Sequence, residues 1–358
     1  MLFIPHKHLY ISGTSYVSAD EPDYKEVITD ANSRRRMGRL LKMAVWCGLK
    51  SLDGVPSERV SGIITSTGAG FMKDTISFGS SIFDREETLL NPSPFMQSTF
   101  NTASGYIALI RKIHAYNTTY VQQADGFAAS LVDAAMLLDD AGEGNVALVG
   151  AFDEVTPEVD VIRQRLGLYR VGDGFLPLGE GAAAFLLSAA MPTDGSESCR
   201  ATEMSAGPGG DGSESASERG GDANSECSIG PLRGSESASW PCDESGSESS
   251  SEPLHESGGT SSRSLNGTKD GNAALRFCGL ANLSDLPKCA ENPIAELFGI
   301  NAGVNVISCA DHIESLGAFR SLLPVLLCKL ISEQQIPDGY TAIVDNVNED
   351  GVIVLLHK

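Results

Sequence analysis

Residues 117–154 constrain the fold of this chain more than any other stretch. A short segment leads to a polar corner at 122–126, after which apolar side chains recur at spacings of one, three and four, as in an amphipathic helix. The apolar run at 145–151 has the length of a strand and is followed by Asp153 and Glu154. Strand, corner, helix and strand in this order predict a βαβ unit, whose corner places side chains at a helix N-terminus.

Composition divides the rest of the chain. Between residues 192 and 272, Ser, Glu, Gly and Asp dominate, and Gly-Ser-Glu-Ser recurs. Apolar residues are too sparse there to cover a core, so we expect residues 192–272 to be a disordered, solvated insert. The flanking segments, 1–191 and 273–358, have ordinary globular composition and together suffice for one core with two sheet-bearing halves.

Shorter patterns predict single elements in these halves. Ser33 has the position of a helix N-cap, because apolar residues from Met37 to Leu49 follow it on one face. A second apolar helix is expected at 314–330, and the run at 304–310 indicates a buried strand. Further strands are predicted within residues 2–15, 60–66, 178–188 and 273–283, and the segments 341–345 and 351–356 are expected to pair as a terminal hairpin.

Charge and cysteine content exclude several classes of function. The formal net charge is −21, so neither nucleic acid nor an anionic membrane is an expected partner. The eight cysteines form no Cys-x-x-Cys pair and no His-spaced metal pattern, so we expect no metal site and no cofactor. No apolar run reaches transmembrane length and no signal peptide opens the chain, which favours a reducing cytoplasm.

Three motifs together suggest a family. They are Val-Gly-Ala-Phe-Asp-Glu at 149–154, Gly-Glu-Gly-Ala within 178–188, and a series of Asn-Pro, Gln-Ser-Thr and Asn-Thr within 91–109. The chain in this respect resembles the β-ketoacyl synthases of the thiolase-like superfamily, and especially a bacterial subgroup of ketosynthase-like N-terminal domains. The resemblance covers residues 33–190 and is thin over 273–358. It implies an α/β, thiolase-like layered α/β/α fold whose second half is abbreviated.

The expected reactive corner departs from that family. Aligned on Gly126, Gln123 occupies the position at which condensing enzymes carry their nucleophilic Cys. Condensation needs a thiolate to hold the acyl chain, whereas a Gln amide has no nucleophilic form at neutral pH. The resemblance makes Gln at this position the mark of the chain length factors, the non-condensing partners of ketosynthases. The alternative is that Gln122 and Gln123 form an ordinary polar turn.

The second half also lacks the family's catalytic motifs. Neither His-Gly-Thr nor Gly-His occurs, and residues 345–351 replace the Phe-Gly-Phe-Gly-Gly gate. His312 is the remaining candidate for a general acid or base. The alternative is an ordinary loop histidine that precedes a helix.

The resemblance also suggests which residues meet the acyl chain and its carrier. In the family, the segment before the nucleophile lies near the dimer interface and the acyl channel, which implies a channel-lining role for Phe95, Gln97 and Asn101. A basic run, the arginines at 34–36, is either a solvated helix face or a patch that steers a phosphopantetheine carrier.

These observations leave three functional hypotheses. The first is a non-condensing, chain-length-factor-like subunit that pairs with an active ketosynthase, or with itself, and serves an acyl carrier protein in fatty-acid, polyketide or polyene-type biosynthesis. The second is a divergent acyltransferase that condenses, or that decarboxylates malonyl carrier with Gln123 and His312. The third is a scaffold that recruits partners through the acidic insert.

Overall fold

The computed structural model describes residues 1–122, 126–142, 144–191, 274–348 and 351–358, which belong to one unit of the chain. Gln123 and the predicted insert at 192–272 lie outside the described residues.

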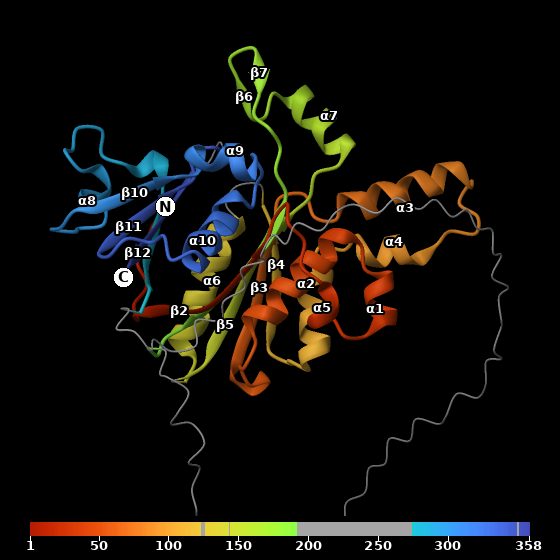
Figure 1. The fold of residues 1–358 in the computed structure, drawn as a ribbon, viewed down its shortest axis with the longest axis horizontal. Coiled ribbons are helices and arrows are strands. Elements are labelled where there is room, and N and C mark those ends of the chain that lie inside the picture. Colours follow the sequence, from red (N-terminus) through yellow and green to blue (C-terminus); the bar gives the residue numbers. More distant parts are fainter. Residues whose placement is uncertain (123–125, 143, 192–273, 349–350) are drawn as a thin grey trace, which may run out of the picture. The chain divides into compact units, whose positions relative to one another are not determined.

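A mixed sheet of ten strands organises the described residues (Figure 1). The strands are β1 Leu2–Phe3, β2 Leu9–Val17, β3 Val60–Thr67, β4 Tyr116–Val121, β5 Val146–Asp153, β8 Gly181–Ser188, β9 Arg276–Asn282, β10 Val304–Ser308, β11 Tyr340–Val344 and β12 Val352–His357. Their order is β10-β11-β12-β9-β2-β8-β5-β3-β4, with β1 paired to β9. Two short strands, β6 Arg170–Val171 and β7 Gly174–Phe175, form a separate hairpin.

The predicted βαβ unit is confirmed. Strand β3 pairs in parallel with both β4 and β5, and helix α6, Gly126–Asp140, connects β4 to β5. Parallel pairing sets the C-terminal ends of these strands side by side at one edge of the sheet.

Helices cover both faces of the sheet, as Figure 1 shows. Helices α2, Arg39–Ser51, and α5, Thr102–Arg111, pack on one face, and α6 and α10, Leu322–Ser332, pack on the other. Strand β5 serves both layers, because alternate side chains of a strand point to opposite faces. Leu148 packs with the residues of α2 and Val149 with those of α6, and both are fully buried. The predicted layered α/β/α fold is confirmed.

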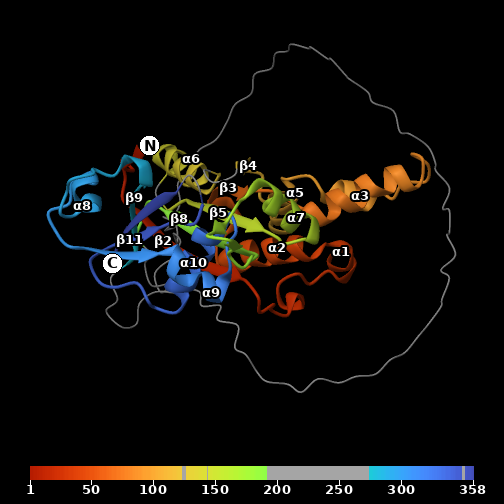
Figure 2. The same ribbon diagram turned by 90° about the horizontal axis from the view of Figure 1, so that it is seen from above.

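The other helices flank these layers. They are α1 Ala31–Arg36, α3 Met72–Asp84, α4 Pro92–Gln97, α7 Pro157–Leu166, α8 Pro293–Leu297 and α9 Ile313–Leu316, with 3₁₀ turns at Tyr24–Glu26, Ser57–Arg59, Leu283–Asp285 and Cys309–His312. Helix α3 buries none of its residues and extends away from the sheet in Figure 2. In the part of the chain that the structure describes, no helix combines the length and the apolar character that a membrane span requires.

The predicted helix start at Ser33 is wrong. The chain forms two helices, α1 and α2, which separate at Met37 and Gly38. Asp30 caps α1, because its carboxylate accepts hydrogen bonds from the backbone N–H groups of Asn32 and Ser33. The apolar spacing identified the buried face of α2, whose own N-cap is Gly38, five residues after Ser33.

The C-terminal half confirms one prediction and corrects two. Strands β11 and β12 pair antiparallel as the expected terminal hairpin. The helix expected at 314–330 is instead divided into α9 and α10 at Gly317, whose φ of +75° is a left-handed conformation. The segment at 304–310 contains a strand but is not buried: Val306 is 56% exposed, because β10 is the last strand of the sheet.

Candidate functional site

Buried and half-buried polar groups gather at the C-terminal ends of the strands, where open α/β sheets bind their ligands. They come from both halves of the chain. We call this cluster the strand-end site; its residues are Thr67, Asp153, Tyr169, Arg320, Ser321, Asp345 and Asn348.

The carboxylate of Asp153, at the end of β5, is the centre of this site. Its Oδ1 accepts hydrogen bonds from Thr67 Oγ1 at 3.0 Å and from the backbone N–H groups of Gly68 and Ala69 at 2.8 and 3.2 Å. Its Oδ2 accepts one from Ser321 Oγ at 2.5 Å. Burial raises the pKa of Asp153, and the four donors oppose this shift. Asp153 therefore ties the loop after β3 to the residue that precedes α10.

Arg320 covers the same loop. A Cβ at Gly68 would lie only 2.6 Å from Cγ of Arg320, so glycine permits this close approach. The guanidinium carbon lies 5.9 Å from the centre of the Tyr169 ring, within the range of a cation–π contact. The two halves of the chain meet through these contacts.

A second buried carboxylate, that of Asp345, follows β11. Its Oδ1 accepts hydrogen bonds from the backbone N–H groups of Val347 and Asn348, both at 3.1 Å, and its Oδ2 accepts one from Nδ2 of Asn348 at 2.7 Å. The hydroxyl of Tyr169 donates to Oδ1 of Asn348 at 2.8 Å. Burial raises the pKa of Tyr169, and the carboxylates of Asp153 and Asp345 add to the shift, so the phenol stays protonated.

Two glutamates border the site. Glu154 accepts a hydrogen bond from the backbone N–H of Lys73 at 2.9 Å, and burial raises its pKa. Glu180 forms an ion pair with Arg39 and accepts a hydrogen bond from the backbone N–H of Val155 at 3.2 Å. Glu180 therefore anchors the turn before β8 to α2.

Helix α6 begins beside the strand-end site. A Cβ at Gly126, the first residue of α6, would lie 3.4 Å from Cβ of Ser66 and 3.8 Å from Cβ of Gln122. Ser66 immediately precedes Thr67, so both described ends of the polar corner lie at this edge. Gln123 itself is outside the described residues.

The described cysteines supply no thiolate to this site. Cys47, Cys309 and Cys328 are buried, and burial raises the pKa of all three thiols, that of Cys328 to about 12. Such thiols stay protonated at neutral pH. Cys278 is half-buried and Cys289 is exposed, and among the described residues neither is hydrogen-bonded to Asp153.

His312 ends the 3₁₀ turn that follows β10, on the C-terminal side of the edge strand. Its backbone carbonyl accepts a hydrogen bond from Ser315 Oγ at 3.0 Å. The hydrogen bonds of the described residues do not connect His312 with Asp153 or Asp345. Its role as an acid or base stays a prediction.

The three predicted channel residues lie around the junction of α4 and α5. Phe95 is 54% exposed, and its ring centre lies 5.1 Å from that of Phe78 on α3. Gln97 is buried, and its Oε1 accepts a hydrogen bond from the backbone N–H of Gly38 at 2.7 Å. Asn101 is exposed and precedes α5 without a side-chain capping bond. Their channel-lining role stays a prediction.

Phe100 connects this junction to the strand-end site. A Cβ at Gly70, in the loop after β3, would lie 2.4 Å from Cδ1 of Phe100. Gly70 also has a φ of +69°. Both this backbone conformation and the close contact with Phe100 favour glycine at position 70.

The sequence patterns missed most of this site. In the sequence, Asp153 ends a predicted strand within the motif at 149–154, and Asn348 lies in the segment 345–351 that replaces the family's gate, but neither pattern indicates a polar cluster. Tyr169, Arg320 and Ser321 carry no signal. A polar residue directly after a buried strand was the one available clue, and it applies to Asp153 and Asp345.

The core beneath the site is closed. A cavity between α2, α5 and the sheet, lined by Thr65, Ala103 and Phe152 among others, measures about 10 Å³. That is room for about one water molecule at most, so an acyl chain does not fit there. The strand-end site can hold loops of both halves in place, but its described residues include no cysteine thiolate.

Comparison with known proteins agrees with this geometry. Residues 14–166 match the family model of the β-ketoacyl synthase N-terminal domain. The ishigamide ketosynthase/chain length factor structure aligns over 98% of this chain and 98% of its own, with 12% sequence identity and a TM-score of 0.57. The structure of AntDE:AntF (apo), a type II PKS acyl-carrier protein in complex with its ketosynthase bound to the hexaketide, aligns over 98% of this chain and 99% of its own, with 13% identity and a TM-score of 0.56. At these identities the likeness shows the fold alone. No curated protein matches the sequence.

Proposed function

We propose that this chain is a ketosynthase-like subunit that does not itself condense acyl chains, because residues 14–166 match the model of the β-ketoacyl synthase N-terminal domain and the fold is thiolase-like. It acts as a chain length factor does, beside an active ketosynthase, in polyketide or fatty-acid-type biosynthesis.

The residue content of the corner before α6 carries this proposal. Residues 122–127, Gln-Gln-Ala-Asp-Gly-Phe, contain no Cys, and Gln123 stands at the expected nucleophile position. The described ends of the corner lie at the strand-end site, where the buried thiols of Cys47, Cys309 and Cys328 supply no thiolate. Acyl transfer needs an activated nucleophile, so a partner has to provide one.

Strand β4 supports association with such a partner. It is the last strand on its side of the sheet and contains neither Lys nor Pro, the residues that commonly protect an edge. Large apolar side chains surround it: Leu109 of α5 is 73% exposed and Met136 of α6 is 60% exposed. A ketosynthase that added a strand along β4 would cover them.

The basic run supports an acidic acyl carrier as a second partner. Arg35 and Arg36 are exposed at the end of α1 in a chain of net charge −21. They precede Gly38, which is hydrogen-bonded to Gln97, and Arg39, which is paired with Glu180 at the border of the strand-end site. A carrier bound to these arginines would deliver its acyl group close to that site.

Acyl loading tests the proposal. The full chain is incubated with an octanoyl-loaded acyl carrier and malonyl carrier, and is then analysed by intact and peptide mass spectrometry. We expect no acyl adduct within residues 122–127 and no elongated product, and product only when an active ketosynthase is added.

Two matched variants test which residue stands at the nucleophile position. The thiol introduced by Gln123→Cys should become acylated, whereas Gln122→Cys, one residue earlier, should not, because the position nearer α6 benefits from the helix N-terminus. Acylation of the unaltered protein, or carbon dioxide release from malonyl carrier that Gln123→Ala abolishes, would instead identify an enzyme in its own right.

A further inference from the structure

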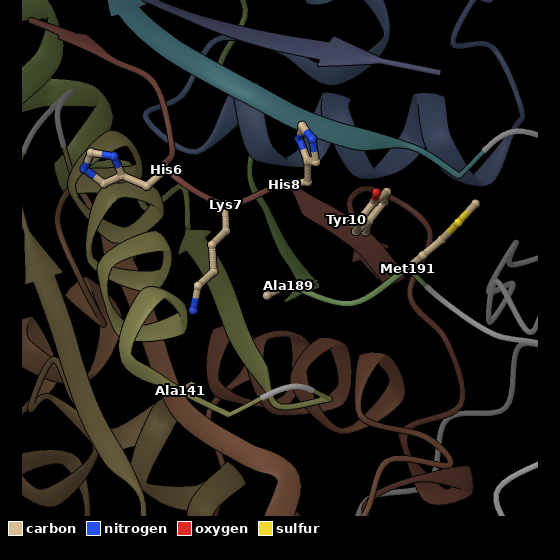
Figure 3. Close-up of a pocket in the computed structure, with 7 residues that line it drawn as sticks. All are labelled: His6, Lys7, His8, Tyr10, Ala141, Ala189 and Met191. Atoms are coloured by element: carbon tan, nitrogen blue, oxygen red, sulfur yellow. The ribbon is translucent and has the colours of Figure 1, made fainter.

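A cavity of about 470 Å³ lies at the end of the sheet opposite the strand-end site. Tyr10, at the start of β2, lies beside Ser188 at the end of β8, whereas Asp153 lies beside Gly181 at the start of β8. The residues that line the cavity are His6, Lys7, His8, Tyr10, Ala141, Ala189 and Met191 (Figure 3).

Lys7 brings a positive charge to the wall of this cavity. Its ammonium donates hydrogen bonds to the backbone carbonyls of Leu138, at 3.3 Å, and Asp139, at the C-terminal end of α6. Figure 3 shows the side chain extending toward Ala141. These acceptors are neutral, and Lys7 forms no ion pair with any described residue. An ammonium has three N–H groups, so one donor is left, and the C-terminal end of α6 offsets only part of the charge.

His8 lines the cavity from the same segment. Its Nδ1 lies 3.2 Å from Nη1 of Arg276, and a guanidinium can only donate. Nδ1 therefore accepts, which places the proton of the neutral imidazole on Nε2. The tautomer is thus fixed by Arg276.

The wall also offers apolar surface beside these polar groups. Tyr10, Ala141, Ala189 and Met191 contribute hydrocarbon surface, and none of the residues that line the cavity is Asp or Glu. Lys7 is the one lysine or arginine among the residues that line the cavity, since Arg276 lies behind His8 and is not part of the lining. An ammonium beside apolar surface matches a ligand with one negative charge and an apolar body. A phosphate dianion would favour more than one cation.

We propose that this cavity binds small aliphatic carboxylates, with the carboxylate on Lys7 and the chain against Tyr10, Ala189 and Met191. The inference does not depend on the proposed function, because the two sites lie at opposite ends of the strands.

Calorimetric titration of the full chain with butyrate, hexanoate and inorganic phosphate tests this site. We expect hexanoate to bind more tightly than butyrate, by about four-fold for each CH₂ that is buried, and phosphate to bind more weakly than either. Lys7→Gln keeps a donor for the carbonyls of α6 but removes the charge, and should weaken hexanoate binding by roughly 10- to 100-fold.

Two further variants separate the site from general effects. Ala189→Leu should narrow the cavity where the chain of the ligand would lie and weaken hexanoate binding while leaving Lys7 in place, whereas Lys288→Met, which removes an exposed lysine from the other half, should leave binding unchanged. Circular dichroism establishes that each variant is folded. Equal affinity for butyrate and hexanoate, tighter binding of phosphate, or undiminished binding by either Lys7→Gln or Ala189→Leu would overturn the proposal.

Discussion

At the scale of single residues, Asp153 determines how the polar edge of the sheet is held. A buried carboxylate with four donors is stable only while those donors stay in place. Two of them are backbone N–H groups of the loop after β3, and one is the hydroxyl of Ser321 from the other half of the chain. One side chain thus joins segments far apart in sequence.

Asp153→Ala should destabilise the protein more than Asp153→Asn. Alanine leaves the buried hydroxyl of Thr67 and the half-buried N–H of Gly68 without this acceptor, at a cost of about 1–3 kcal/mol for each group that water does not reach. Asparagine keeps an acceptor for them and can donate to Ser321. Urea denaturation measures both, and exposed Asp173→Asn serves as control with a change within about 0.5 kcal/mol. Equal losses for the two Asp153 variants would contradict this account.

The same carboxyl should make stability depend on pH. Its folded pKa is raised above the ordinary value of 3.8, so the folded state holds its proton more tightly than the unfolded state. Stability from this group is complete below the unfolded pKa and is lost as the pH rises through the folded pKa. The stability of the unaltered protein relative to Asp153→Asn should therefore fall from pH 4 to pH 7 in urea titrations. A rising difference would show that the donors, and not burial, dominate.

At the scale of elements, the junction of α9 and α10 depends on two glycines. A Cβ at Gly317 would lie 2.3 Å from the backbone nitrogen of Gly179, and the φ of Gly317 is +75°. The backbone N–H of Ala318 donates to the carbonyl of Pro177 at 2.7 Å. This contact holds the segment before β8 against the start of the last helical region, and so positions Arg320 and Ser321.

Gly317→Ala should be among the most damaging single changes, with a loss of at least about 3 kcal/mol from backbone overlap and the left-handed conformation together. Gly299→Ala provides the matched control, because Gly299 also has a positive φ, of +65°, but open space around it. It should cost about 1–2 kcal/mol in the same thermal or urea melts. Similar losses for both variants would mean that conformation alone, without the contact to Gly179, sets the cost.

Sequence patterns predicted the elements well where one local signal decides the structure. The βαβ unit at 117–154 and the terminal hairpin are confirmed, because apolar runs and helical spacing are local. The break at Gly317 depends on contact with Gly179, and the exposure of β10 depends on its place at the end of the sheet. The strand-end site was hidden for the same reason, since Tyr169, Arg320 and Asn348 are brought together only by the fold.

At the scale of the whole molecule, the two edges of the sheet differ in what surrounds them. Exposed Leu109 and Met136 flank β4, whereas β10, at the other end, exposes Val306 within the strand itself. We expect the edge at β4 to carry the ketosynthase partner, because more apolar surface remains uncovered there.

Lysines at the two edges test this assignment. Leu109→Lys combined with Met136→Lys should abolish co-purification of a Cys-containing ketosynthase while leaving the melting temperature nearly unchanged, because both side chains are exposed. Val306→Lys, on β10, should not affect the complex. Retention of the partner by the double variant, or its loss with Val306→Lys, would assign the interface elsewhere.

The pairing of β2 bears on how many residues this protein needs in order to fold. Tyr10 pairs with Ser188, the last residue of β8, on one side and with Arg276, the first residue of β9, on the other. The end of β8 and the start of β9 are therefore about 10 Å apart. A linker of about ten residues can span that gap in place of residues 192–273. Shortening the connection about eight-fold lowers the entropic cost of closing it by about 2 kcal/mol. A chain shortened in this way should withstand more urea than the full-length protein, and reduced resistance would show that residues 192–273 contribute to stability.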